Sequence, residues 1–69
     1  MNISKANLIK WMRGAKIRYA SEFPIHLNVY LDGKFEVMRR VDVSTKELEE
    51  LYSGYEMDTA IDIYMNAIK

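Results

Sequence analysis

One segment near the middle of the chain, residues 25–37 (IHLNVYLDGKFEV), limits the possible folds more than any other. Apolar side chains alternate with polar ones on both sides of Asp32 and Gly33, which is the period-2 pattern of a half-buried strand. An Asp-Gly pair between two such runs is a strong signal for a tight turn. The sequence therefore predicts a β-hairpin with strands at about 24–30 and 34–41.

The length of the turn decides which side chains share a face of this hairpin. A two-residue turn would put Phe35 and Val37 on the face opposite Leu27 and Val29. A three-residue loop at 31–33, with its glycine in the left-handed conformation of a G1 bulge, pairs Val29 with Phe35 and Leu27 with Val37. We expect the three-residue loop, because it unites the apolar residues on one face.

Before the hairpin, residues 4–20 show the spacing of an amphipathic helix, with Ser4 as a plausible N-cap. We assign residues 1–22 to a basic helix that Pro24 ends, since proline cannot continue one. The apolar stripe along one face of this helix is more typical of a core or dimer contact than of a cofactor site. Its apolar members are Leu8, Trp11, Met12, Ala15 and Tyr19.

The charges are distributed unevenly along the chain although their total is zero. Residues 1–20 carry five basic side chains and no acidic one, whereas residues 21–69 carry five basic and ten acidic side chains. Such asymmetry indicates an arm that contacts a polyanion, or an acidic binding face, or simple neutralisation within the molecule. These interpretations stay open from the sequence.

After the hairpin, the segment STKELEELYSG suggests a short acidic helix at about 45–52. Ser44 and Glu47 have the spacing of a capping box, and the following acids suit the first turns of a helix. On such a helix Leu48 and Tyr52 would share a face. The apolar residues of the remaining stretch to the C-terminus fit both the 3.6-residue period of a helix and the two-residue period of a strand. Periodicity by itself favours a helix slightly.

The composition argues against an enzyme and for a small soluble binding protein. No nucleophile-base set, phosphate-binding glycine loop or metal-ligand spacing occurs, so we expect no catalytic residue, cofactor or metal, and His26 reads as a surface strand residue.

The chain has no cysteine, and 69 residues bury a small core. We therefore expect one α+β domain, 1–69, that forms a homodimer, with a helical part (1–22) and a part that contains the hairpin, the acidic helix and the C-terminal element (23–69). Interrupted apolar runs argue against a signal peptide or a membrane span, which favours the cytoplasm.

The hairpin and the acidic segment together resemble a known family, the small dimeric uracil-DNA glycosylase inhibitors of certain Bacillus phages. The resemblance runs over residues 32–52 and more weakly over 25–68. It comprises the turn DGK, the Val43-Ser44 pair and the run LEELY. Ile61, Ile63 and Met65 match alternating aliphatic residues of the family, which implies a strand at about 60–66 in a small antiparallel sheet, with a helix as the alternative.

The resemblance implies a function in the host cytoplasm as well as a fold. Members of the family are DNA mimics that occupy the DNA-binding cleft of the glycosylase, without a cofactor, and block uracil excision. By position, Leu48 would contact the enzyme's wedge residue, Glu49 would replace a phosphate, and Tyr52 would flank it, with Leu51 and Glu47 beside them. Two alternatives remain: a nucleic-acid-binding or regulatory protein that uses the basic N-terminal segment, and an interaction module for another host protein.

Overall fold

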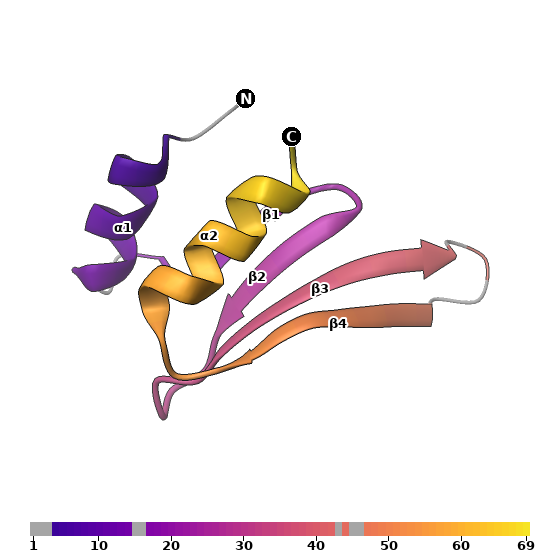
Figure 1. The fold of residues 1–69 in the computed structure, drawn as a ribbon. Helices are drawn as coiled ribbons and strands as arrows, with labels where there is room; N and C mark the ends of the chain where they lie inside the picture. Colours follow the sequence, from indigo (N-terminus) through magenta and orange to yellow (C-terminus); the bar gives the residue numbers. More distant parts are fainter. Residues whose placement is uncertain (1–3, 15–16, 43, 45–46) are drawn as a thin grey trace.

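The computed structural model describes residues 4–14, 17–42, 44 and 47–69. It is an α+β structure with two helices and a four-stranded antiparallel sheet in these ranges. The strands follow one another in the sheet in chain order, so the sheet is a simple meander (Figure 1). In order along the chain, the elements are α1 (Lys5–Arg13), β1 (Tyr19–Glu22), β2 (Ile25–Val29), β3 (Phe35–Asp42), β4 (Glu47–Gly54) and α2 (Met57–Ala67).

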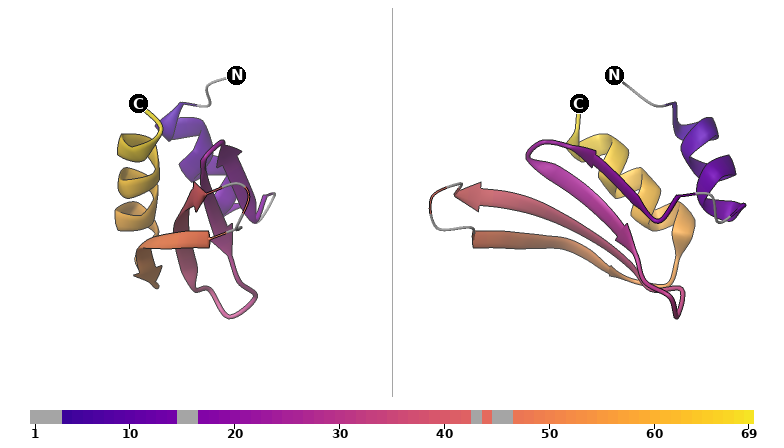
Figure 2. Two further views of the ribbon diagram at one scale, coloured as in Figure 1. Left: turned by 90° about the vertical axis from the view of Figure 1, so that its right-hand side faces the viewer. Right: turned by 180° about the vertical axis from the view of Figure 1, so that it is seen from behind.

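Both helices lie on the same side of the sheet, so the described residues form two layers (Figures 1 and 2). Helix α2 packs on β2, β3 and β4, and α1 packs beside α2. The core lies between α2 and the sheet and is closed at the side by α1. Its buried apolar members are Leu8, Met12, Ala20, Ile25, Leu27, Phe35, Val37, Ala60, Ile61 and Tyr64.

The central hairpin, β2–β3, confirms the predicted register. Val29 pairs with Phe35 and Leu27 pairs with Val37, which places all four on the face toward α2. Gly33 has φ +93°, the left-handed backbone that the three-residue loop requires. The backbone amide of this glycine donates to the Tyr30 carbonyl at 3.0 Å and closes the turn.

The N-terminal helix is shorter than predicted, and a strand follows it. Ser4 is the N-cap as expected, because its hydroxyl accepts a hydrogen bond from the Asn7 amide at 3.2 Å. The helix ends at Arg13, however, and the prediction for 4–20 is wrong at its C-terminal end, where β1 pairs with β2. This pairing buries Ala20 opposite Leu27, a contact that a continued helix could not make. Residues 1–3 and 15–16 of the predicted segment lie outside the described residues.

The turn between β1 and β2 contains the proline that was expected to end the helix. Glu22 pairs with Ile25, so Phe23 and Pro24 are the two central residues of the turn. The peptide bond between them is cis, with proline at the third position, as in type VI turns. Pro24 therefore connects two strands.

The acidic helix predicted at about 45–52 is wrong over the residues that the structure describes there. Glu47–Gly54 is strand β4, paired antiparallel with β3 along its whole length. Ser44 does not cap a helix, since its hydroxyl and its amide both donate to the Asp42 carboxylate, at 2.8 and 2.9 Å. Pairing with β3 outweighs the local helix signals, because the strand directs Tyr52 toward the core beside Val37. Residues 45 and 46 lie outside the described residues.

The C-terminal strand predicted at about 60–66 is also wrong, and the helical alternative is confirmed. Residues Met57–Ala67 form α2. Ala60, Ile61 and Tyr64 are buried against the sheet, and their spacing is that of one helix face. The 3.6-residue period was the correct signal, and the strand that the family resemblance implied was not.

Candidate functional site: the acidic edge of the sheet

Strand β4 forms one edge of the sheet and carries the exposed carboxylates predicted for the site. We call Glu47, Glu49 and Glu50 the acidic edge; all three are exposed. Between them lies Leu48, whose side chain is 43% exposed. Acidic side chains on an edge strand disfavour pairing with a second acidic strand and leave the edge accessible to a basic partner.

Alternation along β4 distributes these side chains over both faces of the sheet. Glu49 lies opposite Arg39. Both side chains are on the face of the sheet that α2 covers nearer to the C-terminal end of β4. The guanidinium donates to the carboxylate through Nε at 2.8 Å and also through Nη2. Leu48 and Glu50 point to the other face, opposite Arg40 and Met38. Within the described part of the chain, the carboxylate of Glu50 forms no hydrogen bond or ion pair with another residue.

The outer ends of β3 and β4 extend beyond the helices, which leaves this part of the sheet projecting from the body (Figures 1 and 2). Val41, near the end of β3, is 54% exposed for the same reason. The acidic edge and Leu48 are on this projecting part. A surface of this shape can enter a cleft of another protein more readily than a flat face can.

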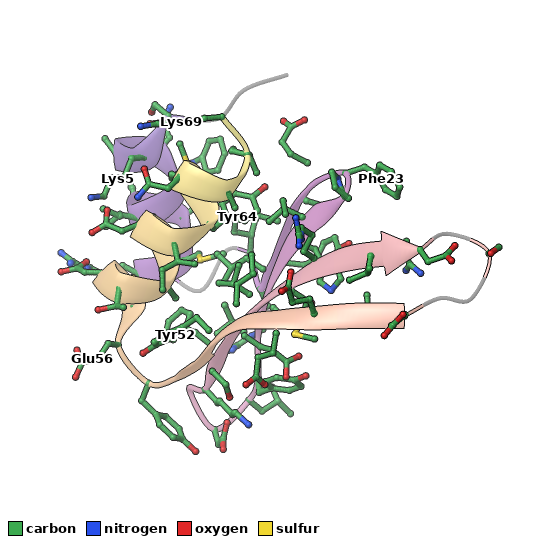
Figure 3. All side chains as sticks on the ribbon, turned by 45° about the vertical axis from the view of Figure 1, so that its right-hand side comes forward. Lys5, Phe23, Tyr52, Glu56, Tyr64 and Lys69 are labelled. Atoms are coloured by element: carbon green, nitrogen blue, oxygen red, sulfur yellow. The ribbon has the colours of Figure 1, made fainter. Side chains whose placement is uncertain are left out.

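Two of the five predicted site residues turn inward. Leu51 is half-buried and packs against the core. The Tyr52 ring lies over Gly54, where an added Cβ would come within 2.6 Å of the Tyr52 hydroxyl. That hydroxyl accepts a hydrogen bond at 3.1 Å from the amide of Glu56, the N-cap residue of α2, and Figure 3 shows both residues near the start of this helix. Leu51 and Tyr52 thus have structural roles, and the exposed predicted set reduces to Glu47, Leu48 and Glu49.

The uneven charge of the sequence becomes a separation of charge in space. Residues 47–68 contain six acidic and no basic side chains, and they form β4 and α2. Helix α1, which packs beside α2 and lies away from the projecting ends of β3 and β4 (Figure 1), exposes Lys10 and Arg13. Lys5 on α1 forms an ion pair with Asp62 on α2, so part of the asymmetry is neutralised within the molecule.

Two exposed tyrosines, Tyr30 and Tyr55, lie near the β2–β3 turn. The sequence did not point to them as site residues. Tyr30 donates to the Glu36 carboxylate at 2.7 Å, and this hydrogen bond raises the pKa of the Tyr30 phenol, with smaller contributions from desolvation and the carboxylate charge. Tyr55 donates to the Asp32 carboxylate at 3.2 Å. A shallow hollow is lined by Tyr30, Leu31, Asp32 and Lys34. Tyr55 and Leu31 come from different segments, so only the fold brings them to the same end of the molecule.

The described residues show no candidate metal site. They contain no group of three or more histidine, cysteine, aspartate or glutamate side chains placed to hold a metal ion. His26 stacks on Tyr19, with ring centroids 6.2 Å apart, and lies on the sheet face away from the helices. Neither described helix has the length and apolar composition needed to cross a bilayer.

Comparisons with known proteins do not place the chain in a family. No protein-family model, curated protein or solved structure matches it. A functional inference therefore depends on the site itself and on the short resemblance over residues 32–52.

Proposed function

We propose that the protein is an inhibitor that binds a uracil-DNA glycosylase in its DNA-binding cleft and blocks uracil excision by mimicking DNA. The observation that carries this proposal is the acidic edge on the projecting part of β3–β4. A cleft that binds a polyanion attracts carboxylates at long range and orients them through a few contacts. The resemblance over residues 32–52 supports the choice of this enzyme among DNA-binding proteins.

The contact differs from the one expected from the sequence because the acidic residues come from a strand. Alternate residues of a strand lie about 6.6 Å apart on one side. Glu47 and Glu49 are related in this way, so they present a short row of negative charge. Leu48, between them and directed to the opposite side, is the exposed apolar side chain that a partner can desolvate.

The ion pair between Glu49 and Arg39 sets a condition on this binding. The guanidinium neutralises part of the acidic edge, so a cation of the enzyme shares the Glu49 carboxylate with Arg39 or displaces it. Both side chains of the pair are about half exposed, at 50% and 47%, so breaking it in water costs only about 0–1 kcal/mol. The pair is therefore no obstacle to tight binding.

The test is uracil excision from a labelled single-stranded oligonucleotide by a bacterial uracil-DNA glycosylase, with and without the protein. We expect stoichiometric inhibition. Changing Glu47→Gln together with Glu49→Gln removes two charges from the acidic edge and should weaken inhibition at least tenfold, or about 1.4 kcal/mol. The matched control, Glu56→Gln with Asp58→Asn, removes the same charge from the start of α2 and should leave inhibition within about twofold.

One observation favours the alternative function, direct binding of nucleic acid. Lys10 and Arg13 are exposed on α1, away from the buried Leu8 and Met12. A gel shift of the same oligonucleotide by the protein alone separates the two functions. Inhibition without a shift supports a protein-directed inhibitor, whereas a salt-sensitive shift that Lys10→Gln with Arg13→Gln abolishes would assign the function to α1.

A further inference from the structure

Three large side chains are exposed at the end of the molecule that holds the β2–β3 turn. Tyr30 is 45% exposed, Leu31 is 91% exposed and Tyr55 is 64% exposed. We call these three residues the tyrosine surface. Tyr55 belongs to the connection between β4 and α2, which lies beside the turn (Figure 1). Exposed apolar and aromatic side chains that gather from two segments mark an interaction site more often than single ones do.

A hollow of about 470 Å³ opens on this surface and is lined by Tyr30, Leu31, Asp32 and Lys34. One water molecule takes up about 30 Å³ of the liquid, so the hollow has room for a side chain of another molecule. The hollow is shallow, whereas sites for small molecules enclose most of the ligand. Its shape therefore suits one side chain of a protein partner.

Hydrogen bonds within the chain hold the two rings in place. The Tyr30 hydroxyl donates to the Glu36 carboxylate at 2.7 Å, and the Tyr55 hydroxyl donates to the Asp32 carboxylate at 3.2 Å. The Lys34 amide donates to the other oxygen of Asp32 at 3.1 Å, so this carboxylate is fixed from both sides. Binding to rings and a carboxylate that are already ordered costs less conformational entropy.

These hydrogen bonds also determine what a ligand must bring. Both phenol hydrogens are donated within the chain, so the two tyrosines offer a partner their ring faces and oxygen lone pairs. Segments 30–36 and 55–56 contain three acidic side chains and one basic side chain, Lys34. This surface of ring faces, acceptor atoms and net negative charge favours a cation that donates hydrogen bonds. It repels phosphates, and therefore nucleic acids and anionic lipid surfaces.

Arginine meets these requirements better than any other protein side chain. Its guanidinium group is planar, stacks on aromatic rings and donates two parallel hydrogen bonds to a carboxylate. The ammonium group of lysine is compact and strongly hydrated, so it gains less from a ring face. The exposed Leu31 side chain offers an apolar contact for the methylene groups of an arginine.

We propose that the tyrosine surface is a docking site for a protein segment that carries an arginine. The guanidinium stacks on the Tyr30 ring in the hollow and donates to the Asp32 carboxylate, and its methylene groups pack on Leu31. Lys34 lines the same hollow, so a carbonyl or hydroxyl oxygen of the partner segment lies beside the arginine and accepts from the ammonium group.

The tyrosine surface is separate from the acidic edge. Between Phe35, the first residue of β3, and Arg40, which pairs with Leu48, the strand advances five residues of about 3.3 Å each, or roughly 16 Å. The two surfaces can therefore bind different molecules at the same time. The inference is independent of the proposed glycosylase contact.

The test is an NMR titration of the isotope-labelled full chain with a blocked peptide, N-acetyl-glycyl-arginyl-serinamide. We expect the amide signals of 30–36 and 55 to shift, with dissociation in the millimolar range because one side chain makes most of the contact. The side-chain protons of the peptide arginine should shift upfield, since they lie over a ring. The matched peptide has citrulline in place of arginine, which keeps the planar shape without the charge, and should bind roughly fivefold more weakly or less.

Two variants test the contact from the side of the protein, with circular dichroism to show that each is folded. Tyr30→Leu and Asp32→Asn should each weaken binding of the arginine peptide roughly fivefold or more. Asp32→Asn keeps the side-chain oxygen that accepts from the Lys34 amide, so the turn is retained. The matched control, Tyr19→Leu, removes a 55% exposed tyrosine from β1 and should leave binding within about twofold.

Three results would overturn the proposal. The first is equal binding of the arginine and citrulline peptides, and the second is binding that neither Tyr30→Leu nor Asp32→Asn weakens. The third is the absence of any shift at peptide concentrations well above the millimolar range. If phosphatidylcholine vesicles broaden the same amide signals and the arginine peptide does not shift them, the surface contacts lipid and no arginine.

Discussion

Two leucines four residues apart allow the register of the central hairpin to be tested by one pair of identical substitutions. Leu27 is fully buried between Ala20 and Val37 on the neighbouring strands, whereas Leu31 at the turn is 91% exposed. Leu27→Ala removes a core side chain and leaves a cavity, which costs about 2–5 kcal/mol. Leu31→Ala removes the same atoms from water and should change stability by less than about 0.5 kcal/mol.

The expected loss at Leu27 is large for a chain of this length. Domains of 69 residues have a total free energy of unfolding of about 3.5–10 kcal/mol. A loss of 2 kcal/mol would lower the melting temperature by about 8 °C or more, and a loss of 5 kcal/mol could unfold the protein at room temperature. Urea unfolding followed by circular dichroism and by the fluorescence of Trp11 measures both variants under the same conditions. Equal losses for the two variants, or a larger loss for Leu31→Ala, would refute the register and the burial derived from it.

Three further substitutions test the left-handed turn, the hydrogen bond of Tyr52 and the burial of Tyr64. Gly33→Ala should lower the free energy of unfolding by about 1–2 kcal/mol in urea, because φ is +93°. No atom lies within 4 Å of the added Cβ, so backbone strain is the whole effect. A neutral result would contradict the left-handed turn. Tyr52→Phe should lower the free energy of unfolding by about 0.5–1 kcal/mol, because the hydrogen bond from the Glu56 amide is lost, and it should leave glycosylase inhibition unchanged. Lost inhibition with unchanged stability would instead place Tyr52 on the binding surface. Tyr64→Phe concerns alkaline stability: burial, with smaller contributions from neighbouring charges, raises the pKa of Tyr64 above 10.0, so its contribution to stability is complete below pH 10 and is lost as the pH rises through the folded-state pKa. The urea midpoint of the Tyr64→Phe variant should therefore fall less steeply above pH 10 than that of the wild type, and parallel curves would exclude this role.

Sequence reasoning succeeded where local signals and burial point to the same structure. In the central hairpin, the alternation of apolar residues and the glycine at the turn both require the three-residue loop, and Val29 pairs with Phe35 as predicted. Ser4 as N-cap is a similar case, since its effect reaches only the next turn of the chain. Neither inference needed to know what lies across the core.

It failed where pairing between distant residues competes with local preference. The Ser44 and Glu47 spacing favours a helix, but β3 offers an unpaired edge that a strand can satisfy and a helix cannot. Strand β1 was missed because four residues with one buried side chain, Ala20, carry too little alternation to be detected. At the C-terminus, the helical period of Ala60, Ile61 and Tyr64 was a better guide than the family resemblance.

The candidate site was predictable in its charge but not in its geometry. The acidic residues of segment 47–50 are visible in the sequence as a local excess of carboxylates. Their placement on a projecting edge strand depends on the pairing of β4 with β3. The inward direction of Tyr52 depends on the position of α2, whose N-cap amide it binds. The direction of the Tyr52 side chain thus follows from the tertiary structure, and the sequence pattern of segment 47–54 does not encode it.

The measurement that tests the central claim most directly is an amide NMR titration of the isotope-labelled protein with a bacterial uracil-DNA glycosylase. The backbone chemical shifts of the free protein first establish whether residues 47–54 are extended. We predict that they are, and that added enzyme shifts or broadens the amide signals of 39–42 and 47–50 before any on α1. Helical shifts at 47–54, or perturbations confined to Lys10, Arg13 and the rest of α1, would contradict the assignment of function to the acidic edge.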